Sequence, residues 1–289
     1  MIVTSTYENK PVYVEHFDNM TDLIETVRGR PPSPNSYGSK DYIGQDMDIY
    51  DPNWSGFKDS ETMRQSMTYG RAPKSALEHI GKLREDIAKE ADERKKAEIQ
   101  PAPFGCLLNV PRYSAGNDMC MMLKRPTKTE PKRMRVCIDC GILAGVGQRD
   151  ITRGTEAIMR VLMKLDAEGY ELVITATKTS LMDDPYAIFA FDVKIKDYKE
   201  KLDVSRLYNI VGTRAFTRCL AFAVWERHPH YRGDVGGTLV NRIGREKFEK
   251  FTKDYMNCDR VIAMGVLADD MAGCTDSELD DYVLSVIRS

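Results

Sequence analysis

The chain has 289 residues, 42% of them hydrophobic, and a formal net charge of −2 at pH 7. A chain of this size can bury a substantial core, as one large domain or as a core with an appended region. The near-neutral charge excludes a basic field over the whole surface, so a nucleic-acid partner would need a local basic patch. No apolar run is long enough to span a bilayer, and the first residues lack the pattern of a signal peptide. We therefore expect no membrane contact and a cytoplasmic location.

The seven cysteines are odd in number and lie mostly in apolar segments. Thiols in such settings usually behave as small hydrophobic side chains, so we expect reduced cysteines and no disulfide framework. Cys137 and Cys140 form an isolated Cys-x-x-Cys, without the second pair that a zinc site of this type needs. We interpret both as core cysteines.

Residues 1–100 are predicted to form a helical and irregular N-terminal region. In chain order they contain a β-prone segment at residues 12–14, a helix at 19–28, a polar stretch at 29–58, and helices at 61–69 and 74–98. Ser60 is placed to cap the second helix, Gly70 to end it, and Pro73 to open the third. From Glu15 to Glu61 ten acidic residues stand against four basic ones, so we do not expect this part of the chain to contact phosphate.

Residues 101–289 are predicted to form an α/β core that ends in an acidic helix. Strands are expected at residues 133–139, 170–177, 186–193 and 260–264, with helices at 152–168, 203–226, 245–256 and from 275 onward. Thr275 and Glu278 match a capping box at the start of the last helix. The alternation of strands and helices predicts a mainly parallel sheet flanked by helices, with Rossmann-like or von Willebrand A-like topology and not an OB-fold.

The loop after the first core strand lacks the side chains that catalysis or cofactor binding would need. In open α/β sheets, ligands bind at this position. Gly145 and Gly147 begin a dinucleotide-binding pattern, but Asp150 stands in place of its third glycine. A carboxylate there repels pyrophosphate. We therefore expect no cofactor, and a binding protein instead of an enzyme.

Asp139 resembles, in its position, the first residue of the metal-binding Asp-x-Ser-x-Ser segment of von Willebrand A-type domains. Gly141 and Leu143 occupy the places of the two hydroxyl side chains. Neither residue offers a side-chain oxygen to a hard cation such as Mg²⁺. We expect a similarity of topology without a metal site.

Two segments combine basic and aromatic residues, a pattern with which proteins hold single-stranded nucleic acid. Residues 106–135 contain seven basic side chains and two acidic ones, and residues 194–218 contain seven and three. The alternative is an ordinary solvated surface, because charged residues make up 30% of the chain. The candidate nucleic-acid-binding residues are Arg112, Tyr113, Lys124, Arg125, Lys128, Lys132, Arg133, Arg149, Arg153, Lys194, Lys196 and Tyr198.

The last helix mixes acidic and apolar residues, and two interpretations are open. It packs on the sheet through Leu279, Val283 and Ile287, or it is a free tail that recruits a partner and competes with nucleic acid for the basic surface.

Several motifs resemble a family of uncharacterised proteins of tailed bacteriophages. They are Asn109-Val-Pro-Arg-Tyr-Ser-Ala-Gly-Asn-Asp-Met-Cys-Met121, the segment at residues 152–171, Trp54-Ser-Gly-Phe, and Met67-Thr-Tyr-Gly70. The chain is also similar in size to the single-stranded-DNA-binding RNA polymerase cofactors of podoviruses that package a giant virion RNA polymerase, which it resembles. The resemblance implies a protein of the host-cell cytoplasm that binds single-stranded DNA and assists transcription or replication, with a phage RNA polymerase as a partner.

The runner-up hypothesis is a non-catalytic protein-interaction domain of von Willebrand A-like topology that lacks a metal site. The sequence leaves open whether the chain forms a homo-oligomer.

Overall fold

The computed structural model describes residues 2–31, 56–71, 80–81, 85, 99–103, 107–124, 132–143, 145–183, 186–230 and 238–288. Most of the predicted polar stretch at residues 29–58 and of the predicted helix at 74–98 lies outside these residues. Within them, no helix is both long enough and apolar enough to cross a membrane.

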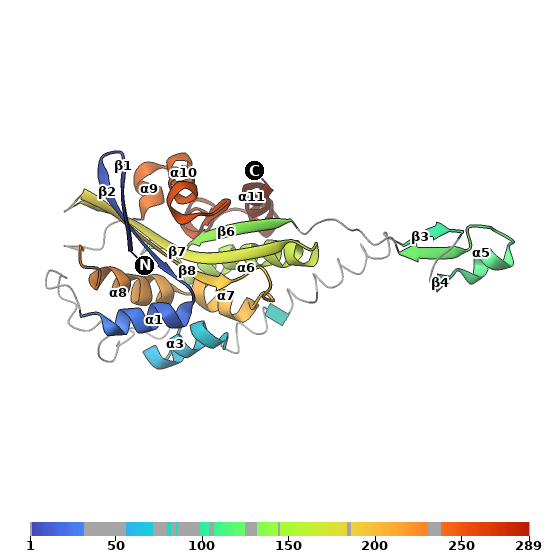
Figure 1. Cartoon of the computed structure of the whole chain (residues 1–289), viewed down its shortest axis with the longest axis horizontal. Helices are drawn as coiled ribbons and strands as arrows, with labels where there is room; N and C mark the ends of the chain where they lie inside the picture. Colours follow the sequence, from blue (N-terminus) through green and yellow to red (C-terminus); the bar gives the residue numbers. More distant parts are fainter. Residues whose placement is uncertain are drawn as a thin grey trace.

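A six-stranded sheet forms the centre of the protein, in the order β1-β2-β8-β7-β6-β9 (Figure 1). Its strands are β1 (Ile2–Tyr7), β2 (Lys10–Phe17), β6 (Arg133–Asp139), β7 (Glu171–Asp183), β8 (Tyr186–Lys196) and β9 (Arg260–Ala263). Strand β6 is parallel to β7 and β9, and β2 is parallel to β8, whereas β1–β2 and β7–β8 are antiparallel. The predicted α/β class with a mainly parallel sheet is confirmed. The sheet is nevertheless mixed, because the connection from β7 to β8 is too short to bring β8 back in parallel.

Helices cover both faces of the sheet (Figure 1). On one face, the larger hydrophobic core is enclosed by α1 (Met20–Gly29), α3 (Ser60–Tyr69), α6 (Gln148–Ala167), α7 (Val204–Val211) and α8 (Phe222–Glu226). On the other face, α9 (Leu239–Ile243) and α10 (Arg245–Met256) enclose a smaller core. Successive side chains of β6 point to opposite faces of the sheet, so Val136 and Ile138 lie in the larger core and Cys137 in the smaller.

The helices differ from the predicted ones mainly at their ends. Helix α10 has the predicted bounds, and α6 starts four residues earlier than expected. The predicted helical region at residues 203–226 is interrupted: α7 is capped by Gly212, and a π-helical segment, η1 (Phe216–Ala221), leads into α8. A second π-helical segment, η2 (Val266–Asp270), follows β9.

The structure divides the chain differently from the predicted boundary at residue 100. Strands β1 and β2 belong to the main sheet, and α1 packs in its core. The parallel pairing of Val14 with Ala190 joins distant parts of the chain, which no local pattern predicts. A second, three-stranded sheet contains β3 (Ile99–Ala102), β4 (Leu107–Leu108) and β5 (Met121–Lys124), joined by α5 (Val110–Ser114). Figure 1 shows this small unit projecting away from the main sheet.

The last helix, α11 (Asp276–Arg288), packs against the main body. Leu279, Val283 and Ile287 are fully or almost fully buried in the larger core. The docked interpretation is therefore confirmed for this structure, and the free tail is wrong.

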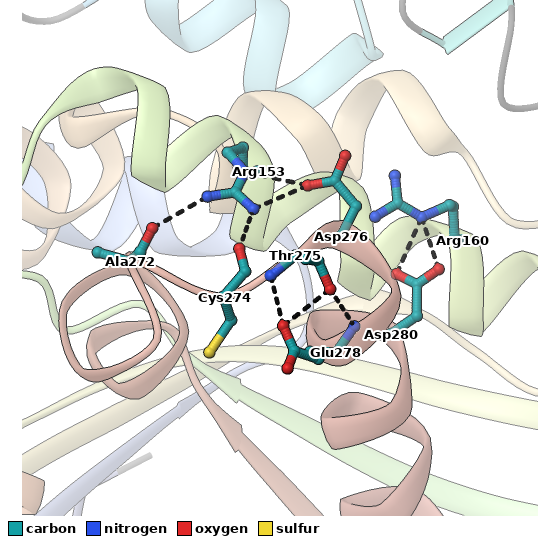
Figure 2. A network of polar contacts seen from close by, with 8 residues as sticks. All are labelled: Arg153, Arg160, Ala272, Cys274, Thr275, Asp276, Glu278 and Asp280. Carbon is teal, nitrogen blue, oxygen red and sulfur yellow. Dashed lines mark hydrogen bonds and ion pairs between the residues drawn. The ribbon is translucent and has the colours of Figure 1, made fainter.

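Two sets of polar contacts fix the first turns of α11: a capping box at its start and ion pairs with α6 (Figure 2). The predicted capping box is present: the N–H of Thr275 donates to the Glu278 carboxylate at 2.7 Å, and the N–H of Glu278 donates to the Thr275 hydroxyl at 3.3 Å. From α6, Arg153 Nε donates to Asp276 at 3.0 Å, and Arg160 Nε donates to the Asp280 carboxylate at 2.8 Å.

Candidate functional site

Two backbone loops meet at the carboxyl end of β6. The first loop starts at Cys140, whose N–H donates to the carbonyl of Thr177 at 2.8 Å. The loop after β9 approaches so closely that a Cβ atom on Gly265 would lie 2.9 Å from the carbonyl oxygen of Gly141. The two loops therefore approach each other closely at Gly141 and Gly265. Helix α6 begins directly after the first loop, with Gly147 as an N-cap that makes no side-chain hydrogen bond.

Asp139 and Lys178 form a buried charged pair beside this loop. Asp139 ends β6 with no exposed surface, and Lys178 in β7 is 3% exposed. A Cβ atom on Gly141 would lie 2.8 Å from Thr238 Cγ2, 2.9 Å from Asp139 Oδ2 and 3.0 Å from Lys178 Nζ, so only glycine fits beside these three side chains. On the other side of the carboxylate, the Thr179 hydroxyl donates to Oδ1 at 3.5 Å.

Burial moves the pKa values of both groups toward neutrality. Burial raises the pKa of Asp139 to about 6, and the Lys178 ammonium opposes this shift. Burial also lowers the pKa of Lys178 to about 8, opposed by the Asp139 carboxylate. At pH 7 both groups are ionised, and Lys178 provides the positive charge next to Asp139. Among the described residues, no three or more His, Cys, Asp or Glu side chains gather in a way that could hold a metal ion.

Part of the predicted nucleic-acid surface lies on the small unit. Arg112 and Tyr113 are exposed on α5, Tyr113 with 63% of its surface. Lys124 is the last residue of β5, and Arg125 and Lys128 lie outside the described residues. These residues precede, in the chain, the point where β6 enters the main sheet.

Three predicted residues are held by partners inside the protein. Lys196 is 2% exposed, and its Nζ donates to the carbonyl of Leu172 at 2.9 Å, so it cannot also reach a phosphate. Arg153 binds Asp276 and two backbone carbonyls of the α11 approach, which makes it a structural residue (Figure 2). Lys194 is partly exposed and pairs with Asp197 at 2.9 Å. We correct the predicted set by removing Lys196 and Arg153.

Another predicted residue, Arg149, is exposed in the first turn of α6, near the carboxyl end of β6. It is therefore separated from Lys132 and Arg133, which lie at the opposite end of that strand.

Cations and aromatic rings come together at the amino end of β6. Lys132 Nζ lies 5.5 Å from the ring centre of Tyr170, and the Arg133 guanidinium lies 5.4 Å from that of Tyr198. Arg135 Nε donates to the hydroxyl of Tyr198 at 3.3 Å. We call Lys132, Arg133, Arg135, Tyr170 and Tyr198 the amino-end cluster. The structure thus gathers Lys132, Arg133 and Tyr198 from the predicted set, whereas Lys194 lies on β8, which β7 separates from β6.

The amino-end cluster also contains two residues absent from the predicted set, Arg135 and Tyr170. Arg135 is two residues from Arg133 and therefore shares its side of β6. Tyr170 precedes β7, and the parallel register that pairs Arg133 with Glu171 brings Tyr170 beside Lys132. The two-residue period of a strand is sufficient to identify Arg135, whereas the identification of Tyr170 requires the pairing register of β6 and β7.

Acidic groups partly balance the amino-end cluster. Arg133 Nε lies 2.8 Å from Glu171, and the N–H of Arg135 donates to the Asp259 carboxylate at 2.7 Å. The Arg133 side chain is 63% exposed, so solvent and salt screen its ion pair. A weak surface pair of this kind leaves the guanidinium accessible to a phosphate.

The sequence matches the model of one protein family, described as "Domain of unknown function (DUF7192)", over residues 4–262. The chain belongs to the DUF7192 family. No curated protein and no solved structure matches it.

The DUF7192 match covers β1 to β9 apart from Ile2, Val3 and Ala263, and it includes the small unit. The amino-end cluster and the Asp139–Lys178 pair therefore both lie within the region that defines the family.

Proposed function

We propose that this DUF7192 protein binds single-stranded DNA through the amino-end cluster. The observation that carries the proposal is the pairing of cations with two rings, Lys132 with Tyr170 and Arg133 with Tyr198, at 5.5 and 5.4 Å. Single-strand binders use cations that follow the phosphate backbone and rings on which bases stack. The amino-end cluster supplies both at the amino end of β6, with Lys132 and Arg133 on opposite sides of the strand.

The small unit extends this surface along the chain. Residues 106–135 carry seven basic side chains against Asp118 and Glu130, and they include α5, part of the amino-end cluster and the segment between them, residues 115–131. Arg112 and Tyr113 are exposed on α5. The segment between the two surfaces adds Lys124, Arg125 and Lys128 against Asp118 and Glu130, whereas the chain's near-neutral total charge offers little to a rigid duplex.

The resemblance to phage proteins supports a role in the host-cell cytoplasm, in transcription or replication of a phage genome. We propose a phage RNA polymerase as the protein partner and a role as its cofactor. Binding without catalysis is the simplest account of a surface built from cations and tyrosines.

The proposal predicts that single-stranded oligonucleotides bind at least about tenfold more tightly than duplexes of equal length, because only unpaired bases stack on Tyr170 and Tyr198. Fluorescence anisotropy at a fixed salt concentration measures both affinities. Tyr198→Leu should weaken single-strand binding by roughly 1 kcal/mol or more. The matched control is Tyr255→Leu, since Tyr255 lies in α10 and donates to the carbonyl of Thr6. Equal affinities for the two polymers would contradict the proposal.

A second candidate function is a protein-interaction domain of von Willebrand A-like topology without a working metal site. The strand order β8-β7-β6-β9, with β7 and β8 antiparallel, favours it. The charges at Asp139 and Lys178 favour it too, because an ammonium stands beside the carboxylate. This candidate predicts no heat of Mg²⁺ binding in calorimetry and no retention of oligonucleotides at low salt. Retention of single strands would count against it.

A further inference from the structure

Strand β1 forms one edge of the main sheet, and no other strand among the described residues pairs with its outer side (Figure 1). The backbone of an edge strand presents N–H and C=O groups that can pair with another strand. Proteins usually protect such an edge with charged side chains, proline, a bulge, a short strand or a covering helix. The opposite edge has such protection, because β9 has only 4 residues and its Arg260 donates to the carbonyl of Ile287 in α11.

Strand β1 lacks these protections over most of its length. Its sequence, Ile2-Val-Thr-Ser-Thr-Tyr7, contains no charged residue and no proline. Its register with β2 runs without a bulge, from Ile2 opposite Glu15 to Tyr7 opposite Lys10. The side chains of residues 3–6 are exposed. With 6 residues, β1 also has the length of an ordinary strand, so it is an open edge that a second strand can extend.

The turn between β1 and β2 determines which backbone groups of β1 point outward. Glu8 and Asn9 have positive φ angles of 47° and 64°, which is the pattern of a two-residue type I′ hairpin. In this hairpin Tyr7 and Lys10 exchange backbone hydrogen bonds, and every second residue of β1 before Tyr7 does the same with β2. The residues whose N–H and C=O groups point away from β2 are therefore Ile2, Thr4 and Thr6.

Two neighbours of Thr6 agree with this orientation. Pro11, which has no N–H to donate, lies opposite Thr6, where no hydrogen bond between the strands is needed. The hydroxyl of Tyr255 in α10 donates to the Thr6 carbonyl at 2.7 Å, so this carbonyl is reached from outside the hairpin. A carbonyl oxygen has two lone pairs and can accept a second bond. Within the part of the chain that the structure describes, the outward groups of Ile2 and Thr4 have no hydrogen-bond partner.

We propose that β1 pairs in antiparallel orientation with β1 of a second copy of this chain, so that the two main sheets form one continuous sheet. The twofold axis passes beside Thr4, which faces Thr4 of the partner subunit, and Ile2 faces Thr6 of the partner subunit. In this register each pair of outward residues exchanges both of its backbone hydrogen bonds. The twofold contact closes on itself and uses the open edge of both copies.

The side chains of β1 favour a second copy as the occupant of this edge. In a twofold pairing a charged residue near the axis would oppose its own like charge, and β1 has no charged residue. The pairs Thr4 with Thr4 and Val3 with Ser5 suit a sheet, because threonine and serine form cross-strand hydrogen bonds. Val3 is 38% exposed and would lose part of this apolar surface to solvent-free contact. Three strands separate β1 from β6, so the dimer does not depend on the proposed DNA surface.

Sedimentation equilibrium of the full chain without nucleic acid tests the proposal. A contact of this limited size predicts a weak dimer with a Kd of roughly 1–100 µM, so the wild-type mass should rise from one chain to two across this range. Thr4→Lys and Thr4→Glu each place like charges opposite each other at the axis and should each raise Kd about fivefold or more. Thr4 is exposed, so neither change should unfold the chain. An equimolar mixture of the two variants should restore the dimer, because opposite charges then face each other.

Thr4→Val is the matched control, because it retains the backbone groups and a β-branched side chain and should keep the wild-type Kd within about twofold. A wild type that stays monomeric up to about 500 µM would overturn the proposal and leave the edge to a strand of a different protein. A dimer that Thr4→Lys and Thr4→Glu leave unchanged would place the interface elsewhere. If the two variants stay monomeric when mixed, the twofold register at Thr4 is wrong.

Discussion

Replacing Lys178 with methionine should destabilise the folded protein by roughly 3–5 kcal/mol at pH 7. The substitution leaves the Asp139 carboxylate in a site with no exposed surface and without the nearby cation that lowers its pKa. Asp139→Asn should have a cost of similar size, because it leaves the Lys178 ammonium buried alone. Urea-induced unfolding of each variant measures the loss as a lower midpoint with an unchanged slope.

The double variant Asp139→Asn/Lys178→Met provides the control for this prediction. It removes both buried charges and nearly preserves volume, so its stability should lie within about 1 kcal/mol of the wild type or above it. A double variant as unstable as either single one would contradict an electrostatic coupling between the two residues. That result would show that side-chain shape, and not charge, determines the stability of the fold at these two positions.

The pH dependence of stability follows from the same two pKa values. Asp139 has a folded-state pKa of about 6, above its ordinary value. Its contribution to the free energy of unfolding is therefore present in acid and is lost as pH rises to about 6. Lys178 has a folded-state pKa of about 8, below its ordinary value, so its contribution is present at high pH and is lost as pH falls through about 8. Between about pH 6 and 8 both buried groups are charged, and this ionisation lowers the free energy of unfolding. We therefore expect the uncharged double variant to be no less stable than the wild type.

Deleting residues 275–289 should unfold the protein or leave it without fixed tertiary packing. The deletion removes four buried apolar side chains, those of Leu279, Val283, Val286 and Ile287. At roughly 1.5–3 kcal/mol for each side chain, the loss is about 6 kcal/mol or more, which is comparable to the whole stability of a typical domain. Near-ultraviolet circular dichroism and dye binding to exposed apolar surface would detect the change.

Point substitutions separate packing from charge in α11. Val283→Asp places a charge in the larger core and should reproduce much of the effect of the deletion, whereas Asp281→Asn on the exposed side should change stability by less than about 0.5 kcal/mol. A truncated protein that unfolds cooperatively near the wild-type midpoint would mean that α11 contributes little to the core.

Local sequence patterns predicted the centre of the fold well and its edges poorly. The bounds of β6 and α10 follow from apolar periodicity and match the structure. The sequence predicts only a β-prone segment at residues 12–14, outside the core, and no strand at residues 2–7, because the core partner of β2, β8, comes more than 160 residues later in the chain. The pairing register of such strands depends on tertiary packing, which a local window does not contain.

The candidate site was predictable in its residue types but not in its partners. Counting cations identified Lys132 and Arg133, yet it could not distinguish them from Lys196, which is equally basic in sequence and buried in the structure. Arg153 likewise looked like a surface cation until α11 was placed against α6 (Figure 2). Composition reports how many charges a segment carries, and only the fold reports which of them already have partners.

The salt dependence of single-strand binding tests the central claim most directly. If four to six cations of the amino-end cluster and the connecting segment meet phosphates, log K should fall with log salt at a slope of roughly −3 to −4. Lys132→Ala/Arg133→Ala should flatten the slope by about one unit or more, whereas Arg245→Ala/Lys247→Ala, which removes two exposed cations of α10, should leave it unchanged. An unchanged slope in a folded Lys132→Ala/Arg133→Ala variant, or no binding by the wild type, would contradict the account.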